Sequence, residues 1–430
     1  MKVLGIDIGT TTISAVVLEG EKLLSSLTLP NSSFINTVNP WEKVQSPEYI
    51  IKVCYEALDR LMSEHDDIGK IGITGQMHGI LYINAEGRAV SPLYTWQDGR
   101  GDLPCGENGS YAQQLSGLTG YAVATGYGML THYYNTKNCL VPSEALMFCT
   151  IPDYLAMQLC GLAKPLMDAS MAASLGLFSV EKLCFDLEAV TDAGLSTDML
   201  PPLADKPCIG TYRDIPVCTA IGDNQASFIG ACSGTLESML VNVGTGSQFS
   251  AYSGDYMGCE GLETRPFPGG GYLLVGASLC GGRAYALLEK FIRDTASAVC
   301  GEVPDSGYEA MEQLLSMGKP DDLPLIVPLF QGTRQQPDLR GSISGLSTAN
   351  FTPRHFVWAM LYGMVKELHD MYLSYLSAGG QAGTLVGSGN GLRKNAHMQS
   401  CFSELFAQSL TMSACNEEAA VGAARFTLMN

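Results

Sequence analysis

The sequence lacks the patterns that mark several common protein classes. No Cys-x-x-Cys pair occurs among its 14 cysteines, which argues against a structural zinc site. No run of five basic residues occurs, and 25 Lys and Arg against 43 Asp and Glu give a formal net charge of −18. That balance argues against a nucleic-acid or anionic-membrane partner. No window of eighteen apolar residues exists, so no transmembrane helix is predicted.

The cysteines and the N-terminal stretch favour a cytoplasmic protein. Single cysteines within apolar segments, such as Cys54, Cys160 and Cys232, are typical of small buried residues in a reducing compartment. Asp7 interrupts the first apolar run before the core of a signal peptide could form. A length of 430 residues with 46% hydrophobic residues is enough for two or three domains, each with its own core.

The first eighteen residues predict two strands joined by a polar turn. Two apolar runs, residues 3–6 and 13–18, flank one carboxylate, one glycine and three hydroxyls: Asp7, Gly9, Thr10, Thr11 and Thr12. The glycine lets another group approach closely, and the threonines offer N–H and hydroxyl donors to an anion. Asp7 is placed to hold a cation or its water. An ordinary hairpin whose aspartate caps its own turn would give the same pattern.

The same pattern recurs about half a chain later. Residues 239–247 align without a gap onto residues 4–12, and the second turn consists of Gly244, Thr245, Gly246 and Ser247. Asn242 stands where the first copy has Asp7, so only the first half carries a carboxylate for a metal. A repeat of this kind indicates two related halves. Two such hairpins facing across a cleft would grip a polyphosphate from both sides.

Strand patterns followed by helical ones in both halves predict an α/β protein with mixed sheets. The domain boundary is expected near Gly234, which gives domains of residues 1–233 and 234–430. A helix should start at Ser46-Pro47, the longest helix should run from Thr352-Pro353 to Gly379-Gly380, and Asn416 should cap the last one. We expect residues 201–216 to be irregular.

The chain has no Gly-x-x-x-x-Gly-Lys-[Ser/Thr] sequence, so a nucleotide would have to be held in another way. A glycine turn between a predicted strand and a predicted helix is one candidate, because an adenine ring could lie flat on its backbone. The turn consists of Gly387, Ser388, Gly389, Asn390 and Gly391. A tight turn that needs a positive φ would explain the same glycines.

Asp223 ends a predicted strand and precedes a predicted helix. As an N-cap it would stabilise that helix by about 1 kcal/mol. As a general base, a carboxylate at the carboxyl edge of a sheet could accept a hydroxyl proton during phosphoryl transfer. Its position between the two hairpins in the sequence favours the catalytic interpretation, and both could hold together.

Two further segments have the composition of a polyol site. One follows a predicted strand and contains Gln76, Met77 and His78; the other contains Trp96, Asp98 and Arg100. The apolar face of a sugar can stack on a tryptophan while its hydroxyls bond to carboxylate, amide and guanidinium groups. A lone histidine is more often structural than a ligand, and the tryptophan segment could be an ordinary solvated loop.

Taken in order, these segments resemble the FGGY carbohydrate kinases over nearly the whole chain. Residues 7–11 and 244–247 look like the two phosphate motifs of the family, residues 387–391 like its adenosine motif, and residues 222–225 like the segment that carries its catalytic base. The resemblance implies two ribonuclease-H-like (actin-like ATPase) domains around a cleft, with ATP and Mg²⁺ as cofactors. It also implies that Asp7 holds Mg²⁺ through water and that Asp223 is the base. The sugar contacts it implies are Gln76, Met77, His78, Trp96, Asp98 and Asn224.

Within the family, residues 222–227 and 277–282 look most like sedoheptulokinases. The Met77-His78 pair is similar to the form seen in xylulokinases, and residues 126–128 stand where relatives often have a substrate loop containing lysine. The resemblance therefore implies a kinase for the terminal primary hydroxyl of a ketose, with sedoheptulose first and D-xylulose as the alternative. A catalytically silent sugar or nucleotide sensor, or an actin-like filament or chaperone ATPase, would use the same fold. A monomer or a homodimer is expected.

Overall fold

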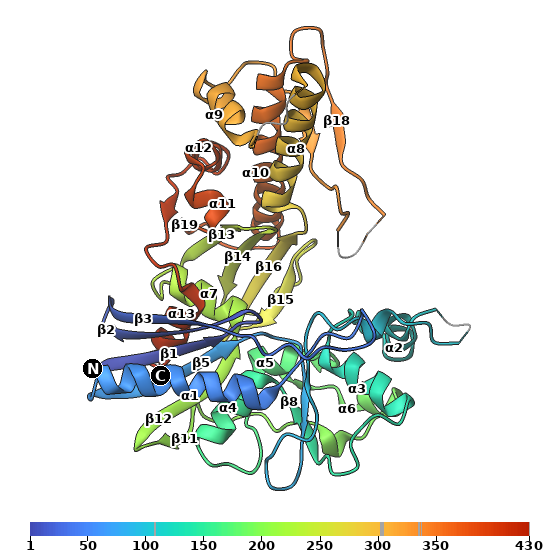
Figure 1. Ribbon diagram of the computed structural model, residues 1–430, viewed down its shortest axis with the longest axis vertical. Helices are drawn as coiled ribbons and strands as arrows, with labels where there is room; N and C mark the ends of the chain where they lie inside the picture. Colours follow the sequence, from blue (N-terminus) through green and yellow to red (C-terminus); the bar gives the residue numbers. More distant parts are fainter. Residues whose placement is uncertain (107–108, 302–304, 334–335, 337, 430) are drawn as a thin grey trace. The chain divides into compact units, whose positions relative to one another are not determined.

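The computed structural model describes residues 1–106, 109–301, 305–333, 336 and 338–429 (Figure 1). The chain packs into two compact units. The first comprises Met1–Thr235, Arg265–Tyr272 and Cys415–Asn430, and the second comprises Leu236–Thr264 and Leu273–Ala414. The linear division at residue 234 stays a prediction; the compact units differ from it by assigning two segments of the second half to the first unit.

The first unit is built on a six-stranded mixed sheet in the order β11-β12-β5-β1-β2-β3. Strands β1, β5 and β12 are parallel, whereas β2, β3 and β11 pair antiparallel with their neighbours. The strands are β1 (Lys2–Ile8), β2 (Thr12–Glu19), β3 (Lys22–Pro30), β5 (Ile68–Gly75), β11 (Cys208–Tyr212) and β12 (Ile215–Gly222). Strand β11 lies within residues 201–216, so the prediction of an irregular segment there was wrong.

Helices cover both faces of this sheet (Figure 1). They are α1 (Pro47–Glu64), α4 (Ile151–Leu159), α7 (Asp223–Ala231) and α13 (Glu418–Phe426). Leu4, Ile6 and Ile8 point to the face covered by α1 and α4, while Val3 and Val16 pack against α13. Strands buried on both faces read as continuous apolar runs rather than alternating ones. Ser46 caps α1 as predicted, since its side chain accepts a hydrogen bond from the Tyr49 N–H.

The last helix approaches the sheet so closely that only glycine fits beneath it. A Cβ atom on Gly5 would lie 2.0 Å from the Ala420 carbonyl oxygen, and one on Gly72 would lie 1.9 Å from that of Ala423. The residue before α13 is Glu417, and no side chain caps the helix. The predicted Asn416 cap was therefore wrong. The position of α13 is decided by backbone contact with the sheet, not by its own capping sequence.

The remainder of the first unit forms a second core beside the sheet, around Tyr82, Met129, Phe148 and Leu175. Its elements are β4 (Val44–Gln45), β6 (Leu81–Ile83), β7 (Leu93–Tyr94), η1 (Gly99–Asp102), α2 (Tyr111–Thr119), α3 (Gly128–Lys137), β8 (Met147–Cys149), α5 (Ala169–Ala173), β9 (Phe178–Ser179), β10 (Cys184–Phe185), α6 (Leu187–Asp192) and η2 (Thr197–Met199). Helix α3 was not predicted. It is buried on nearly all sides, so its sequence has no amphipathic stripe.

The second unit repeats the central pattern of the first. Its sheet has the order β15-β16-β14-β13-β19-β20, with β13 parallel to β19 and antiparallel to β14. The strands are β13 (Ser238–Val243), β14 (Ser247–Ser253), β15 (Glu263–Pro266), β16 (Tyr272–Ser278), β19 (Thr384–Ser388) and β20 (Thr411–Met412). The fold is thus α/β with mixed sheets, as predicted, and each of the two main sheets has six strands.

The helices of the second unit pack partly on its sheet and partly on one another. They are α8 (Gly281–Cys300), α9 (Tyr308–Ser316), α10 (Pro353–Ser377), α11 (Asn390–Arg393) and α12 (Ala396–Leu405), and β17 (Leu325–Val327) pairs with β18 (Ser342–Ser344). Helix α10 is the longest one described, at 25 residues, and Thr352 caps it through a bond from the His355 N–H. Its predicted start at Thr352-Pro353 and its end before Gly379 are confirmed.

The internal repeat holds in the strands and changes in the turn. Ile8 pairs with Ile13 across the first hairpin, which leaves four residues in the turn. Val243 pairs with Ser247 across the second, which leaves three. The gap-free alignment was therefore wrong by one residue at the turn. A Cβ atom on Gly281 would lie 2.4 Å from the Gly246 carbonyl carbon, so the start of α8 packs directly against the shorter turn.

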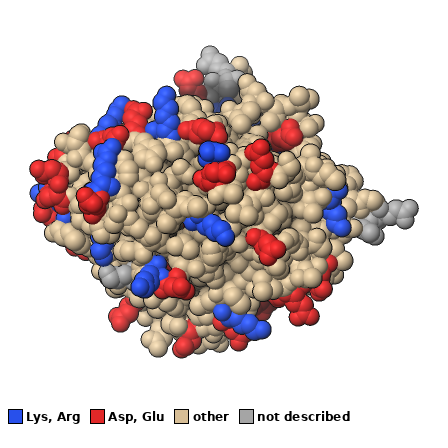
Figure 2. All heavy atoms as spheres, turned by 90° about the horizontal axis from the view of Figure 1, so that it is seen from below, with Lys and Arg blue, Asp and Glu red and all other residues tan. Residues whose placement is uncertain are grey.

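The surface in Figure 2 carries its Lys and Arg side chains singly, among Asp and Glu. No basic cluster is visible on that face. Among the described helices, none combines the length and the apolar character needed to cross a membrane.

Candidate active site

Three of the predicted site segments meet at one edge of the first sheet. Strands β1, β5 and β12 are parallel, and Ile8, Gly75 and Gly222 lie side by side at their carboxyl ends. Asp7 is the last residue but one of β1, while Gln76 and Asp223 directly follow β5 and β12. Ligands of open α/β sheets bind at this edge. The fold therefore brings together residues that are up to 216 positions apart in the sequence (223 − 7).

The Asp223 carboxylate does not cap its own helix. Gly222 is the N-cap of α7, and no side chain caps that helix. Instead, the Asn224 Nδ2 donates to Asp223 Oδ1 at 2.9 Å, and the Arg265 guanidinium donates to Asn224 Oδ1. Burial raises the pKa of Asp223, and Arg265 and the Asn224 bonds oppose that rise. A carboxylate that is oriented, raised in pKa and unused by the helix suits a general base.

Asp7 shares its surroundings with other carboxylates. Burial raises its pKa to about 7, and the negative charges of Asp223 and Glu417 add to the effect. Carboxylate oxygens are ligands that Mg²⁺ prefers, and a cation here would relieve the repulsion between the two aspartates. Among the described residues, no group of three or more His, Cys, Asp or Glu side chains is arranged to hold a metal. Mg²⁺ fits this site only when phosphate oxygens or waters complete its shell.

The first turn is held from three sides by side chains. Asn31 Nδ2 donates to the Gly9 carbonyl oxygen at 2.8 Å, and Gln45 Nε2 donates to that of Thr10 at 2.8 Å. Trp96 Nε1 donates to Thr10 Oγ1 at 3.1 Å. Thr11 and Thr12 remain exposed. The turn is therefore fixed in shape while two of its threonines stay accessible, as an anion site requires.

The histidine segment packs on a residue that the sequence left open. His78 has φ of 72°, an unusual value for a residue with a side chain, and its ring stacks on Tyr127 with centroids 4.6 Å apart. Its Nδ1 lies 2.6 Å from the Ser174 carbonyl oxygen. A Cβ atom on Gly126 would lie 1.9 Å from the Trp96 carbonyl oxygen, so the segment of residues 126–128 also lies against the tryptophan. The structure thus joins the two predicted sugar segments.

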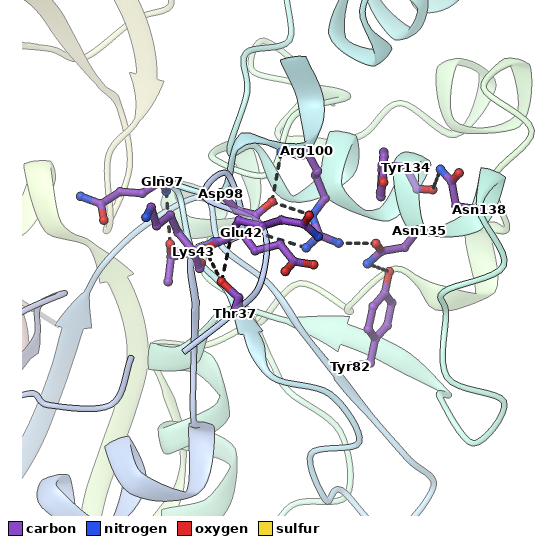
Figure 3. Close-up of polar contacts among 12 residues, drawn as sticks. Thr37, Glu42, Lys43, Tyr82, Gln97, Asp98, Arg100, Tyr134, Asn135 and Asn138 are labelled. Carbon is purple, nitrogen blue, oxygen red and sulfur yellow. Dashed lines mark hydrogen bonds and ion pairs between the residues drawn. The ribbon is translucent and has the colours of Figure 1, made fainter. Parts of the chain in front are cut away.

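Asp98 has a different place from the one expected. Its carboxylate is fully buried and accepts bonds from Arg100 Nε at 2.6 Å, Arg100 Nη2 at 3.2 Å and the Lys43 N–H at 3.0 Å (Figure 3). Arg100 Nη1 also donates to Asn135 Oδ1 at 2.5 Å, and the guanidinium lies over the Tyr94 ring at 4.1 Å. The pair holds the loop in place and leaves no carboxylate oxygen for a sugar. Trp96 remains 46% exposed, so part of its side chain is accessible for stacking.

In the second unit, the turn after β13 and the glycine turn after β19 also converge. Asn242 and Ser388 are partners in the parallel register, and Asn242 Nδ2 donates to Ser388 Oγ at 2.6 Å. A Cβ atom on Gly389, where φ is 87°, would lie 2.5 Å from the Val243 carbonyl oxygen. The Gly282 N–H donates to the Gly244 carbonyl oxygen at 2.9 Å. Glycines therefore allow the backbones of the two turns and of the start of α8 to pack closely against one another.

Comparisons with known proteins identify the family of this chain. The sequence model of the N-terminal domain of the FGGY family of carbohydrate kinases matches residues 2–230. The chain belongs to this family. It is 32% identical to the sedoheptulokinase of Mus musculus over 91% of this chain and 90% of that protein. It is 28% identical to the sedoheptulokinase of Homo sapiens, over 98% and 96% respectively.

The fold comparison extends over both units. The crystal structure of a xylulose kinase from Rhodospirillum rubrum matches all of this chain and 90% of that one, with a TM-score of 0.84 at 19% identity. At that identity the likeness shows the fold alone. FGGY kinases are phosphotransferases that act on alcohol groups, and they use ATP. The prediction of an ATP-dependent carbohydrate kinase is confirmed at that level.

Three residues that support the candidate site were missed from the sequence. Asn31 and Gln45 fix the first turn, and Arg265 fixes Asn224. Asn31 and Gln45 stand in no glycine-rich or otherwise recognisable segment, and Arg265 directly precedes the Pro/Gly-rich residues 266–271. A polar residue that is almost fully buried, as Asn31 and Gln45 are, signals a specific partner only after the fold is known.

Proposed function

We propose that this FGGY kinase transfers the γ-phosphate of ATP to the terminal primary hydroxyl of a ketose, with sedoheptulose as its preferred acceptor. The observation that carries the chemistry is the Asp223 carboxylate at the carboxyl edge of the first sheet, oriented by Asn224 and not used as a cap. The choice of sugar is supported by the similarity to the two sedoheptulokinases, which covers at least nine-tenths of each chain.

In the proposed mechanism, Asp223 accepts the proton of the attacking hydroxyl while Asn224 and Arg265 keep its carboxylate in place. The first turn contributes Gly9 and its threonines to the phosphates, and the second turn contributes residues 244–247. The adenosine would contact Gly387, Ser388, Gly389 and Asn390. Mg²⁺, in the sphere of Asp7, would offset the charge that develops on the transferred phosphoryl group.

The sugar contacts proposed are Gln76, Met77, His78, Trp96 and Asn224. Trp96 offers a partly exposed aromatic side chain, and His78 is oriented by Ser174 and Tyr127. Asp98 is left out of this set because its carboxylate is occupied by Arg100. The Met77-His78 pair favours a second candidate, D-xylulose, since its form is similar to that of xylulokinases.

One experiment separates these possibilities. ADP release with Mg²⁺-ATP should be measured over ketoses of five to seven carbons and matching polyols. We expect the highest kcat/KM with sedoheptulose. A higher value with D-xylulose would replace it by the alternative, and nucleotide binding without ADP release from any sugar would indicate a sensor.

The base is tested separately. Asp223→Asn should leave nucleotide binding nearly intact and lower kcat by roughly 10²–10⁴, the usual effect of losing a general base. Turnover close to that of the wild type would exclude Asp223 from proton transfer.

A further inference from the structure

Thr10 stands at the meeting point of the first phosphate turn and both sugar segments. Trp96 Nε1 donates to its hydroxyl oxygen at 3.1 Å, and Gln45 Nε2 donates to its carbonyl oxygen at 2.8 Å. Gln76 Nε2 in turn donates to Gln45 Oε1 at 3.0 Å. Gln45 and Trp96 therefore bond to Thr10 directly, and Gln76 is linked to it through Gln45.

The Thr10 carbonyl group fixes the orientation of the side-chain amides of Gln45 and Gln76. A backbone carbonyl oxygen can only accept, so Gln45 must turn its NH₂ towards Thr10 and its oxygen towards Gln76. Gln76 must then present its NH₂ to Gln45, which leaves Gln76 Oε1 as a buried acceptor with no partner among the described residues. Both side chains are nearly inaccessible, at 0% and 4% exposure. A sugar hydroxyl that reaches Gln76 would therefore meet an oriented acceptor.

The hydrogen bond from Trp96 also orients the Thr10 hydroxyl. Because its oxygen accepts from Trp96, its single hydrogen is left to donate. A hydroxyl that accepts one hydrogen bond becomes a stronger donor in the next. Trp96 Nε1, at the edge of the indole ring, thus orients the Thr10 hydroxyl of the phosphate turn. The same side chain is partly exposed and is proposed to stack on the sugar.

We propose that Gln45 and Trp96 are positioning residues that couple the occupancy of the sugar segments to the geometry of the phosphate turn through Thr10. The inference rests on the proposed function, because it takes Gln76 and Trp96 as sugar contacts. A sugar that fixes the Trp96 ring and the Gln76 amide also fixes both bonds to Thr10. Nucleotide phosphates should therefore bind more tightly when the sugar is present, and by reciprocity the sugar more tightly with the nucleotide.

The test measures this coupling directly. The full-length protein is titrated with a non-hydrolysable ATP analogue and Mg²⁺, with and without a saturating ketose that the wild type phosphorylates. The ratio of the two Kd values is the coupling factor, expected to be at least about 5 in the wild type, the lower end of typical couplings. Trp96→Phe keeps an aromatic face and removes the Nε1 donor. Thr10→Val keeps the shape and removes the hydroxyl.

We expect each variant to lower the coupling factor at least threefold, with the double variant no lower than the single ones, because both remove the same bond. Gln45→Met should lower the coupling factor through the other bond, independently of Trp96→Phe. Thr211→Val, on an exposed position of β11, is the matched control and should behave as the wild type.

The outcomes distinguish this inference from the function it rests on. A wild type that phosphorylates no ketose contradicts the proposed function. A wild type that phosphorylates a ketose with a coupling factor near 1 overturns the inference alone, as do Trp96→Phe and Thr10→Val variants with the wild-type factor. If one of these variants does not fold, Gln45→Met and the remaining one decide the question by the same ratio.

Discussion

Replacing Gly422 by alanine tests whether backbone contact or helix propensity decides the place of the last helix. Gly422 lies in the middle of α13. Propensity alone predicts that alanine stabilises a helix by about 0.5–1 kcal/mol relative to glycine. The structure predicts the opposite. A Cβ atom there would lie 1.7 Å from the Ala226 carbonyl oxygen and 2.5 Å from its carbonyl carbon, both in α7.

The magnitude follows from what must move. Ordinary contact of a Cβ atom begins at 3.4 Å, so one helix would have to shift by on the order of 1.5 Å, since the opposing atoms are backbone and cannot rotate away. Overpacking a core typically costs about 1–3 kcal/mol, and a backbone contact belongs at the upper end. After the gain in helix propensity is subtracted, we expect the free energy of unfolding to fall by about 2 kcal/mol. In a unit of this size that lowers Tm by roughly 4–8 °C.

Thermal unfolding followed by circular dichroism measures the change. Gly117→Ala is the matched control, because Gly117 also lies inside a helix, α2, and a Cβ atom there meets nothing within 4 Å. It should raise the stability slightly. Since α7 begins at Asp223, three residues before Ala226, Gly422→Ala should also lower turnover. A Gly422→Ala protein as stable as the wild type would refute the packing argument.

Two further predictions concern buried charge. Arg100→Lys should lower the free energy of unfolding in urea by about 2–4 kcal/mol, because an ammonium group cannot replace the forked bonds to the buried Asp98 carboxylate. The control Arg88→Lys, at an exposed position, should change it by less than about 0.5 kcal/mol. Equal effects of the two variants would contradict a stabilising role of the buried Arg100–Asp98 pair. Burial raises the pKa of Asp153 to about 8 although Thr150 donates to it, so its folded pKa lies above the ordinary value of 3.8. Proton binding then favours the folded state, and stability should fall as pH rises from about 4 to 8, by up to about 1.4 kcal/mol per unit. The free energy of unfolding of Asp153→Asn relative to the wild type, measured by urea unfolding, should therefore be higher at about pH 7.5 than at about pH 5.5. If the two proteins instead change in parallel with pH, the Asp153 carboxyl does not bind a proton in the folded state.

Short-range patterns in the sequence were enough for much of the architecture. The polar turns after residues 3–8 and 238–243, the Ser46-Pro47 helix start and the long helix from Pro353 each depend on neighbouring residues, so their signals are complete within a few positions. The order of these segments also identified the family. Residues at strand ends, such as Asp223, could be proposed because the carboxyl edge of a parallel sheet is the same for every strand.

Tertiary structure alone decided which of these groups are available for chemistry. The residues next to Asp98 in the sequence suggest that it is a sugar ligand. In the structure, Arg100 donates hydrogen bonds to both of its carboxylate oxygens. The last helix packs on the first sheet because Gly5 and Gly72 leave room for its backbone, a condition set more than 340 residues away. Gln45 acts on Thr10 from a two-residue strand that carries no motif. A hydrogen-bond partner far along the chain is chosen by packing, whereas a strand, a turn or a cap is chosen by the residues beside it.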